Sequence, residues 1–313
     1  MKRLKFIHIV LVANCCLLVF NSCNPKLFLF TSFKEPASAG LGLLYSSNGY
    51  HWNRLDTILL KPSVGIGAQK IMRDPSMAQG PNGEFHLVFT TEWKGGNGFG
   101  YAHSKDLIHW SEQQYIPVMQ SEKTVVNVWA PELFYDDKQK QFLIIWASCI
   151  PNRFEKGIED ELNNHRLYYT TTKDFHTFTE TKLFFDPNFS VIDATLVKRG
   201  NADYILVLKD NTRPERNIKL AFANNPYGPF TKVSSPITNH FTEGPSVIKV
   251  AHDWLIYFDA YQEKKYGAIR TKDFLSFENI DSLVVVPEGH KHGTVFTTRK
   301  KILHQLIQYS HEK

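Results

Sequence analysis

Cysteine is scarce in this chain of 313 residues, with four in all. Two of them, Cys15 and Cys16, lie in an N-terminal apolar stretch that is expected to be removed. If Cys23 carries a lipid, no disulfide can form, so the fold must depend on a hydrophobic core rather than on cross-links. Cys149 lies within an apolar run and is expected to be an inert core residue.

A strong excess of one charge is also missing. The formal net charge is +5, and three of these charges belong to Lys2, Arg3 and Lys5, which leaves +2 for the rest of the chain. A protein so close to neutrality carries no electrostatic footprint for nucleic acid. We therefore expect no nucleic-acid partner.

The longest apolar run covers residues 6–20, directly after those basic residues. This order predicts a signal peptide at residues 1–22 and a single domain at residues 23–313. The segment Phe20-Asn21-Ser22-Cys23 resembles the lipobox of bacterial lipoproteins. The resemblance implies an exported envelope lipoprotein, facing the periplasm or held at the outer membrane, whose only membrane contact is a lipid on Cys23. An ordinary cleaved signal or an uncleaved anchor helix is the alternative.

The rest of the sequence contains a short phrase five times: a small polar residue, a turn former two positions on, and an aromatic residue four positions beyond. Its copies cover residues 46–52, 104–110, 172–178, 224–230 and 271–277. Such polar side chains nucleate turns, while the aromatic residue packs between sheets. Each copy is therefore predicted to join the third and fourth strands of one blade in an all-β, five-bladed β-propeller.

Each phrase follows an apolar run of strand length, which predicts the second strand of its blade. These runs are residues 27–33, 85–91, 142–148, 204–209 and 254–260. Inner strands are predicted to begin in the segments 73–78, 129–134, 192–197 and 243–248, with the fifth at 291–298. The last blade should thus combine N- and C-terminal strands, which removes exposed sheet edges. Helical spacing predicts a short helix over residues 300–310.

The residues that begin the inner strands should converge at one mouth of the central channel. We expect these at equivalent repeat positions: Asp74, Glu132, Asp193, Glu243 and His292. Carboxylates seldom gather in a buried place without a task. Glycoside hydrolysis needs one carboxylic acid to protonate the leaving oxygen and one carboxylate to activate water, roughly 6.5–9.5 Å apart in inverting enzymes. A third carboxylate can raise the pKa of the acid.

The motifs around these residues resemble glycoside hydrolase family 43. They are Arg73-Asp74-Pro75, Trp129-Ala130-Pro131-Glu132, Ile192-Asp193-Ala194, Thr242-Glu243-Gly244-Pro245 and His292-Gly293-Thr294. The resemblance implies an inverting propeller in which Asp74 is the general base, Glu243 the general acid and Asp193 the residue that tunes the pKa of the acid. No cofactor is required, and a Ca²⁺ ion or a water cluster is implied on the axis beside His292. A satisfied buried histidine is the alternative for that residue.

Wider strings, such as residues 209–217 and 259–268, resemble a branch of this family similar to α-L-arabinofuranosidases, β-D-galactofuranosidases and β-D-xylosidases. This implies exo-acting release of a terminal furanose or xylose from a glycan. Aromatic faces stack on sugars and polar groups bind their hydroxyls. Residues expected to contact substrate are Trp129, Trp93, Tyr261, Arg213, Arg166 and Glu132.

Two other functions are weighed against hydrolysis with inversion. A non-catalytic glycan-binding propeller at the cell envelope would be marked by the loss of one carboxylate, and this chain has lost none. A retaining enzyme similar to the sucrose- and fructan-cleaving propellers would carry the strings Asn-Asp-Pro-Asn and Glu-Cys, and neither occurs.

Overall fold

The computed structural model describes residues 27–155, 164–213 and 215–313. The expected signal peptide at residues 1–22 and the expected lipid attachment at Cys23 lie outside these ranges. Within the described ranges, no helix has both the length and the apolar character needed to cross a membrane.

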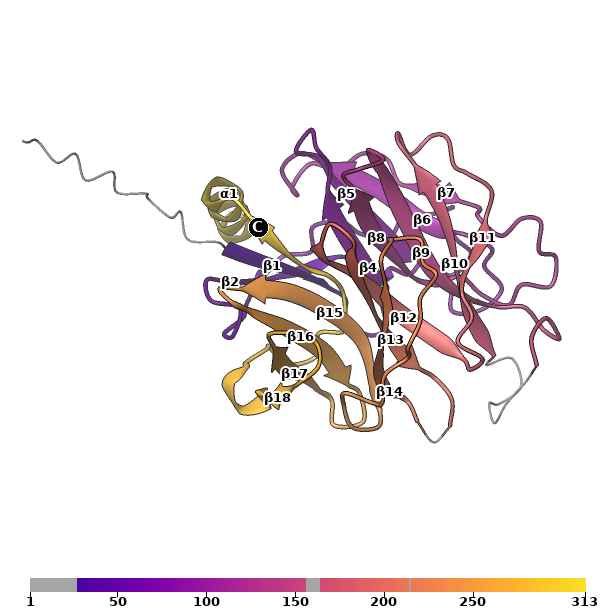
Figure 1. The fold of residues 1–313 in the computed structure, drawn as a ribbon. Coiled ribbons are helices and arrows are strands. Elements are labelled where there is room, and N and C mark those ends of the chain that lie inside the picture. Colours follow the sequence, from indigo (N-terminus) through magenta and orange to yellow (C-terminus); the bar gives the residue numbers. More distant parts are fainter. Residues whose placement is uncertain (1–26, 156–163, 214) are drawn as a thin grey trace, which may run out of the picture.

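Strands dominate the described chain and form five antiparallel sheets around one axis, which confirms the five-bladed β-propeller (Figure 1). From the inner to the outer edge, blade one contains β4 (Arg73–Gln79), β5 (Phe85–Thr90), β6 (Phe99–Ser104) and β7 (Gln114–Ile116). Blade two contains β8 (Trp129–Asp136), β9 (Gln141–Cys149), β10 (His165–Thr172) and β11 (Lys182–Phe185). Blade three contains β12 (Val191–Gly200), β13 (Asp203–Asp210) and β14 (Asn217–Ala223). Blade four contains β15 (Thr242–Val250), β16 (Asp253–Ala260), β17 (Lys265–Thr271) and β18 (Glu278–Asn279).

Blade five joins the two ends of the described chain, as predicted. Its inner strand is β19 (Val295–Thr298), followed by β1 (Leu27–Ser32), β2 (Gly42–Ser46) and β3 (Asn53–Arg54). The strands β19 and β1 are antiparallel, with Leu27 opposite Thr298 and Phe30 opposite Val295. The ring is completed by contacts of β4 with β8, β8 with β12, β12 with β15, β15 with β19, and β1 with β4.

The recurring phrase forms the expected turn in four of the five blades. In the second copy, the Ser104 hydroxyl accepts the backbone N–H groups of Asp106 and Leu107, at 3.2 and 2.8 Å. The Asp106 carboxylate accepts the next two N–H groups, at 2.9 and 2.8 Å. Equivalent bonds link Ser46 with Asn48, Thr172 with Asp174, and Thr271 with Asp273, so these residues set the turn between the third and fourth strands.

Blade three departs from this prediction, because its fourth strand is reduced to a single bridge between Phe222 and Thr231. Its copy of the phrase has Asn224 and Pro226 in place of the hydroxyl and the acidic or amide residue. Proline has no backbone N–H, so Pro226 and Pro229 cannot donate to a sheet ladder. The outer edge of this blade is therefore irregular.

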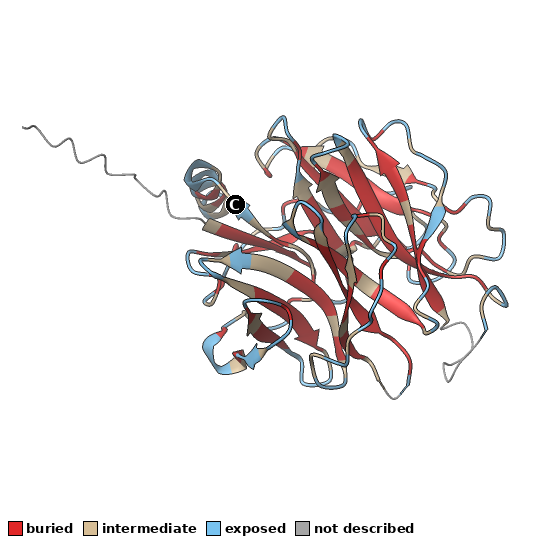
Figure 2. Cartoon of the chain, viewed as in Figure 1, coloured by how far each residue is buried: buried red, intermediate tan, exposed pale blue. Residues whose placement is uncertain are grey.

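The core is divided into five apolar clusters, each between two neighbouring blades. One aromatic residue of the recurring phrase lies in each cluster: Trp52, Trp110, Phe178, Phe230 and Phe277. Figure 2 shows that burial concentrates in the strands and exposure in the connecting loops. The helix α1 (Lys300–His311) confirms the predicted terminal helix and buries Leu303 and Leu306 against blades one and five.

Candidate active site

The inner strand of each of blades one to four contains a β-bulge near its first residue, at the same end of the propeller. The register of pairing with the second strand shifts at four places: between Arg73 and Ser76, Trp129 and Glu132, Ile192 and Thr195, and Glu243 and Ser246. The residue in the bulge has a left-handed backbone, with φ of 49° at Asp74, 46° at Ala130, 49° at Asp193 and 56° at Gly244. Side-chain-bearing residues seldom adopt this conformation, and bulges redirect side chains near functional sites. Here the bulge lifts one residue per strand out of the ladder.

The bulges correct one expectation about the ring of polar residues. Asp74 and Asp193 occupy the bulge, and His292 takes the matching place in blade five, one residue after the bridge between Phe33 and Lys291. Glu243 precedes its bulge residue by one position, and Glu132 lies two positions after Ala130. The prediction that both glutamates occupy the same repeat position as Asp74 and Asp193 is therefore wrong. The two glutamates lie at different depths along the axis.

A narrow axial space lies between the inner strands, lined by Asp74, Asp193, Glu132 and His292 together with the adjoining backbone. Its volume is about 30 Å³. A space of roughly 10–15 Å³ is needed for one water molecule, so this one is large enough for water and too small for a sugar ring. A bound sugar must therefore lie above it, at the mouth.

Asp74 is held by two partners at the edge of this space. Its Oδ1 lies 3.0 Å from Nε2 of His292, and the Thr90 hydroxyl donates to its Oδ2 at 2.8 Å. Burial alone would raise the pKa of Asp74, but the hydrogen bond and charge of His292, with Arg73 and Thr90, lower it below its usual value. Asp74 is therefore ionised, as a general base must be.

His292 is the matching cation. Burial lowers its pKa, but Asp74, Asp193 and Glu243 together raise it to about 9, so the ring is an imidazolium at neutral pH. Gly244 makes room for this ring, because a Cβ on Gly244 would lie 2.0 Å from Cγ of His292. The Gly244 N–H donates to Oδ2 of Asp193 at 3.1 Å. A glycine at this bulge is thus required by the histidine beside it.

Glu243 is paired with a lysine that the sequence did not indicate as functional. Nζ of Lys209 lies 2.7 Å from Oε2 of Glu243, and the lysine side chain is 4% exposed while that of Glu243 is 24% exposed. Burial would raise the pKa of Glu243, but Lys209 and then His292 lower it. The available hint was a lysine at the end of the apolar run 204–209, because lysine is rarely buried without a partner.

Asp193 has the opposite tendency. Burial raises its pKa to about 6, with Glu243 and Asp74 adding to the rise and His292 and Lys209 opposing it. We expected the third carboxylate to raise the pKa of the acid. In this structure the raised pKa belongs to Asp193, because burial dominates there, whereas the ammonium group of Lys209 bonds directly to Glu243 and lowers the pKa of that acid.

The residues around His292 do not suit the Ca²⁺ ion implied by the family resemblance. Glu243, Asp259 and His292 do bring ligand atoms within 4.8 Å of one another. Lys209 pairs with Glu243, however, and Lys291 pairs with Asp259 at 2.9 Å. His292 offers a nitrogen rather than an oxygen and already lies 3.0 Å from Oδ1 of Asp74, whereas Ca²⁺ needs six to eight oxygen ligands. The lysines already neutralise the carboxylates that would bind the ion.

Glu132 lies beneath the mouth rather than at it. Its carboxylate accepts hydrogen bonds from the Thr195 hydroxyl at 2.6 Å and the Thr294 hydroxyl at 3.3 Å. Burial raises its pKa against the effect of these hydroxyls. Because hydroxyl partners hold it at the floor of the axial space, direct contact with a sugar at the mouth is not expected, contrary to the sequence-based assignment.

The stacking role expected for Trp129 conflicts with its surroundings. Its ring stacks on Trp93 and on His165, with centroids 4.9 Å apart in both cases. Its Nε1–H donates to the backbone oxygen of Trp93 at 3.0 Å. Both faces are therefore covered. Trp93 is 47% exposed and is partly covered by the guanidinium of Arg73, 4.6 Å from its ring centre, so it presents mainly an edge to a ligand.

Tyr261 is better placed, because its half-buried ring lies 5.1 Å from Nζ of Lys209, next to Glu243. Arg213 is exposed on the loop between β13 and β14, so its contact with substrate stays a prediction. Arg166 was expected to contact substrate but is buried in β10, with Nε 2.5 Å from Oδ1 of Asp186. Its role is structural.

Solved structures share this fold. An α-L-arabinofuranosidase from Clostridium thermocellum aligns with a TM-score of 0.57 and 13% identity over 86% of this chain and 92% of its own. An α-L-arabinofuranosidase from Lactobacillus brevis aligns with a TM-score of 0.53 and 18% identity over 70% and 74% of the two chains. An exo-β-1,3-galactanase from Phanerochaete chrysosporium aligns with a TM-score of 0.54 and 13% identity over 69% and 50%. At these identities the likeness concerns the fold alone.

No protein with a curated description matches the sequence. Residues 26–302 match the model of a family related to glycoside hydrolase family 43 and described as "Probable glycosyl hydrolase domain". This match covers most of the chain, and an inverting mechanism is consistent with glycoside hydrolase family 43. The protein therefore belongs to the family 43-related glycosyl hydrolases.

Proposed function

We propose that the protein releases terminal sugars from a glycan with inversion of the anomeric centre. The observation that carries this proposal is the pair of Asp74 and His292, which keeps one carboxylate ionised beside a space large enough for water. The space does not admit a sugar ring, so the axis is closed to a glycan chain beneath the mouth. This closure supports action at chain ends rather than at internal bonds.

In the proposed reaction, Asp74 accepts a proton from a water molecule whose oxygen attacks the anomeric carbon. The bond from that carbon to the glycosidic oxygen breaks on the opposite side, and Glu243 donates a proton to the departing oxygen. One water is consumed, Asp74 then gives its acquired proton to solvent, and Glu243 regains a proton through Asp193. Glu243 suits this part because 24% of its side chain is exposed, whereas Asp193 accepts a hydrogen bond from the Gly244 backbone.

Glu243 must be protonated to act as an acid, yet Lys209 favours its ionised form. We propose that a bound sugar excludes water from the rim and so disfavours the charged form of Glu243. Asp193, whose raised pKa of about 6 lets it take a proton from solvent more readily than Asp74 does, then passes that proton to Glu243. Asp193 thus serves as the proton reservoir of the pair, and Lys209 sets the pH range in which the acid operates.

For the substrate, we propose a terminal α-L-arabinofuranose or β-D-galactofuranose, with β-D-xylose as a further option. Support comes from the motif strings noted above and from the two structurally similar arabinofuranosidases. We also propose that the protein works at the cell envelope with a lipid on Cys23; a mature form that remains unlipidated and insensitive to globomycin contradicts this part.

A panel of nitrophenyl furanosides and pyranosides tests the substrate assignment. We expect turnover of arabinofuranoside or galactofuranoside. If neither is turned over while a glycan still binds, the result supports a non-catalytic glycan-binding propeller instead.

The variant Glu243→Gln tests the acid assignment. It should abolish hydrolysis of an unactivated disaccharide and reduce hydrolysis of a nitrophenyl glycoside less, because nitrophenolate needs little protonation. The matched control is Glu263→Gln, an exposed glutamate on the loop before β17. Full activity of Glu243→Gln on the disaccharide contradicts the acid assignment.

A further inference from the structure

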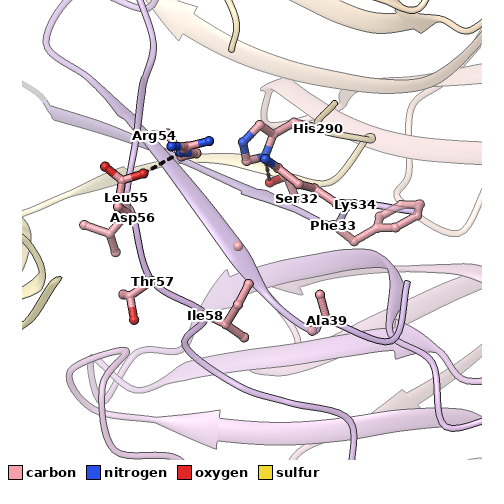
Figure 3. A pocket seen from close by; sticks show the side chains of 12 residues that line it. Ser32, Phe33, Lys34, Ala39, Arg54, Leu55, Asp56, Thr57, Ile58 and His290 are labelled. Atoms are coloured by element: carbon pink, nitrogen blue, oxygen red, sulfur yellow. Dashed lines mark hydrogen bonds and ion pairs between the residues drawn. The ribbon is translucent and has the colours of Figure 1, made fainter. Parts of the chain in front are cut away.

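A second, larger pocket lies at blade five and has no part in the reaction described above. We call it the blade-five pocket; it is lined by residues of segments 32–42 and 54–58 and by His290, and has a volume of about 310 Å³ (Figure 3). This is within the range of roughly 300–1,000 Å³ that is typical of small-molecule sites. It is ten times the volume of the axial space.

The blade-five pocket opens on the same end of the propeller as the catalytic mouth. Phe33, at its wall, pairs through the backbone with Lys291, the residue before His292. The Phe33 ring also packs edge-on against the His292 ring, with centroids 6.0 Å apart. One buried aromatic side chain therefore separates the pocket from His292.

The polar wall of the pocket contains a buried group with unused hydrogen-bonding capacity. His290 is 7% exposed, and its Nδ1 lies 2.7 Å from Oγ of Ser32. Its Nε2 is buried and has no hydrogen-bond partner among the described residues. Figure 3 shows the guanidinium of Arg54 beside the imidazole of His290, whose pKa its charge lowers. A buried polar atom without a partner is costly, and a ligand would satisfy it.

Charge in the pocket favours an anion. Lys34 and Arg54 are the cations of the lining, and Asp56 is its carboxylate, paired with Nε of Arg54 at 2.5 Å. The lining thus has one excess positive charge. Burial lowers the pKa of His290 to about 4, and the charges of Lys34 and Arg54 add to the effect, so these cations act on the ring itself. Apolar walls from Leu55 and Ile58 offer surface to the C–H groups of a sugar.

We propose that the blade-five pocket binds a negatively charged sugar unit of the glycan, on the leaving-group side of the cleaved bond. This inference rests on the proposed exo-hydrolysis, in which the chain beyond the terminal sugar extends out of the mouth and over a neighbouring blade. The negative charge is a carboxylate of a uronic acid or a sulfate ester. The pocket would therefore select acidic glycans without taking part in the chemistry.

Calorimetric titration of the wild-type protein tests binding independently of hydrolysis. The probes are glucuronate, galactose 6-sulfate, glucose and inorganic sulfate. We expect at least one sugar anion to bind about tenfold more tightly than glucose and inorganic sulfate, and the one that binds identifies the charged group. Equal binding of glucose and the sugar anions, equal binding of inorganic sulfate, or no binding of either sugar anion overturns the proposal.

The site of binding is checked with the double variant Lys34→Met/Arg54→Met. Each such charge near solvent contributes up to about fivefold in affinity, so we expect the double variant to lose roughly tenfold. Lys105→Met, which removes an exposed lysine from the blade-one turn, is the matched control and should bind normally. The ring signals of His290 in NMR spectra should shift on addition of the sugar anion. Unchanged affinity in the double variant, or unmoved His290 signals, overturns the proposal.

Kinetics separate this inference from the proposed function. On an acidic oligosaccharide, the double variant should show a raised KM with kcat nearly unchanged, and on a nitrophenyl glycoside both constants should match the wild type. If the protein hydrolyses a glycoside but binds no sugar anion, the proposed role of the blade-five pocket is refuted and the proposed function stands. Binding of a sugar anion with no hydrolysis of any glycoside refutes the proposed function and leaves the pocket as a binding site.

Discussion

Two histidines only two positions apart in the chain, His290 and His292, are buried in opposite electrostatic environments. Burial lowers the pKa of both rings. Around His292, three carboxylates reverse the effect and raise its pKa to about 9, while Lys34 and Arg54 reinforce it at His290, whose pKa falls to about 4. The charge neighbours, rather than burial, therefore decide which histidine is a cation. The difference distinguishes a catalytic mouth from a pocket suited to anions.

The strongest way to break this difference is to remove the charge that His292 faces. Asp74→Asn should lower kcat on the order of 10³-fold, since a general base contributes roughly 10²–10⁴. It should also lower the pKa of His292 toward that of His290, because its nearest carboxylate is gone. Steady-state kinetics and NMR titration of the histidine rings measure both effects. An unchanged pKa of His292 would contradict the ion pair.

The pH dependence of stability should show the two histidines acting in opposite directions. His292 has a raised pKa in the folded state, so its contribution is complete below about pH 6.5 and is lost as the pH rises through about 9. That loss amounts to roughly 3 kcal/mol. His290 has a lowered pKa, so its contribution is present above about pH 6.5 and is lost as the pH falls toward 4.

Denaturant unfolding of the wild type and of His292→Gln, at several pH values, checks this expectation. The variant should lose the decline between pH 6.5 and 9 and keep the decline on the acid side. A wild-type stability that is flat from pH 6.5 to 9 contradicts the assigned charge of His292.

Displacing His292 without changing any charge should have the next largest effect. Gly244→Ala puts a Cβ where the ring of His292 lies and holds it in a left-handed backbone, so the ring must move away from Asp74. We expect kcat to fall about 10²-fold and stability to fall by roughly 1–3 kcal/mol. Gly289→Ala, at a positive-φ glycine with nothing within 4 Å of its Cβ, is the control for backbone strain alone. Equal losses in the two variants would refute the packing argument.

Removing the lysine that pairs with Glu243 tests whether Lys209 controls the pKa of the acid. Lys209→Met removes the charge that lowers the pKa of Glu243, so that pKa should rise. An acid with a higher pKa stays protonated to higher pH, so the alkaline limb of the kcat profile should move upward while kcat falls about tenfold. If the alkaline limb stays in place or moves to lower pH, that limb reports a group other than Glu243.

The smallest change is expected at the other histidine. Lys34→Met removes one nearby positive charge, so the pKa of His290 should rise by less than about one unit, with hydrolysis of a nitrophenyl glycoside unaffected. NMR titration of the ring reports the shift. A lowered pKa would contradict the charge account of the blade-five pocket.

Sequence patterns located the strands well, because turn formers and packing aromatics act locally. The recurring phrase identified all five blades, and the displaced segment 291–298 correctly indicated how the ring is closed. The depth of Glu132 and Glu243 could not be read from spacing, because each bulge adds one residue to an inner strand without adding length.

The contacts missed by sequence analysis all cross from one segment to a distant one. Lys209 in blade three reaches Glu243 in blade four, and Trp129 stacks on Trp93 from the loop after β5 and on His165 from β10. Nothing local in the sequence indicates such partners. The blade-five pocket was missed for the same reason, because it combines residues near both ends of the described chain.

The proton NMR spectrum of the first sugar released, recorded before mutarotation, tests the central claim most directly. If Asp74 activates water at the mouth while Glu243 protonates the leaving oxygen, the product must first appear as the anomer opposite to that of the substrate. A first product with the substrate's own anomeric configuration would mean a covalent intermediate and would contradict this account of the site.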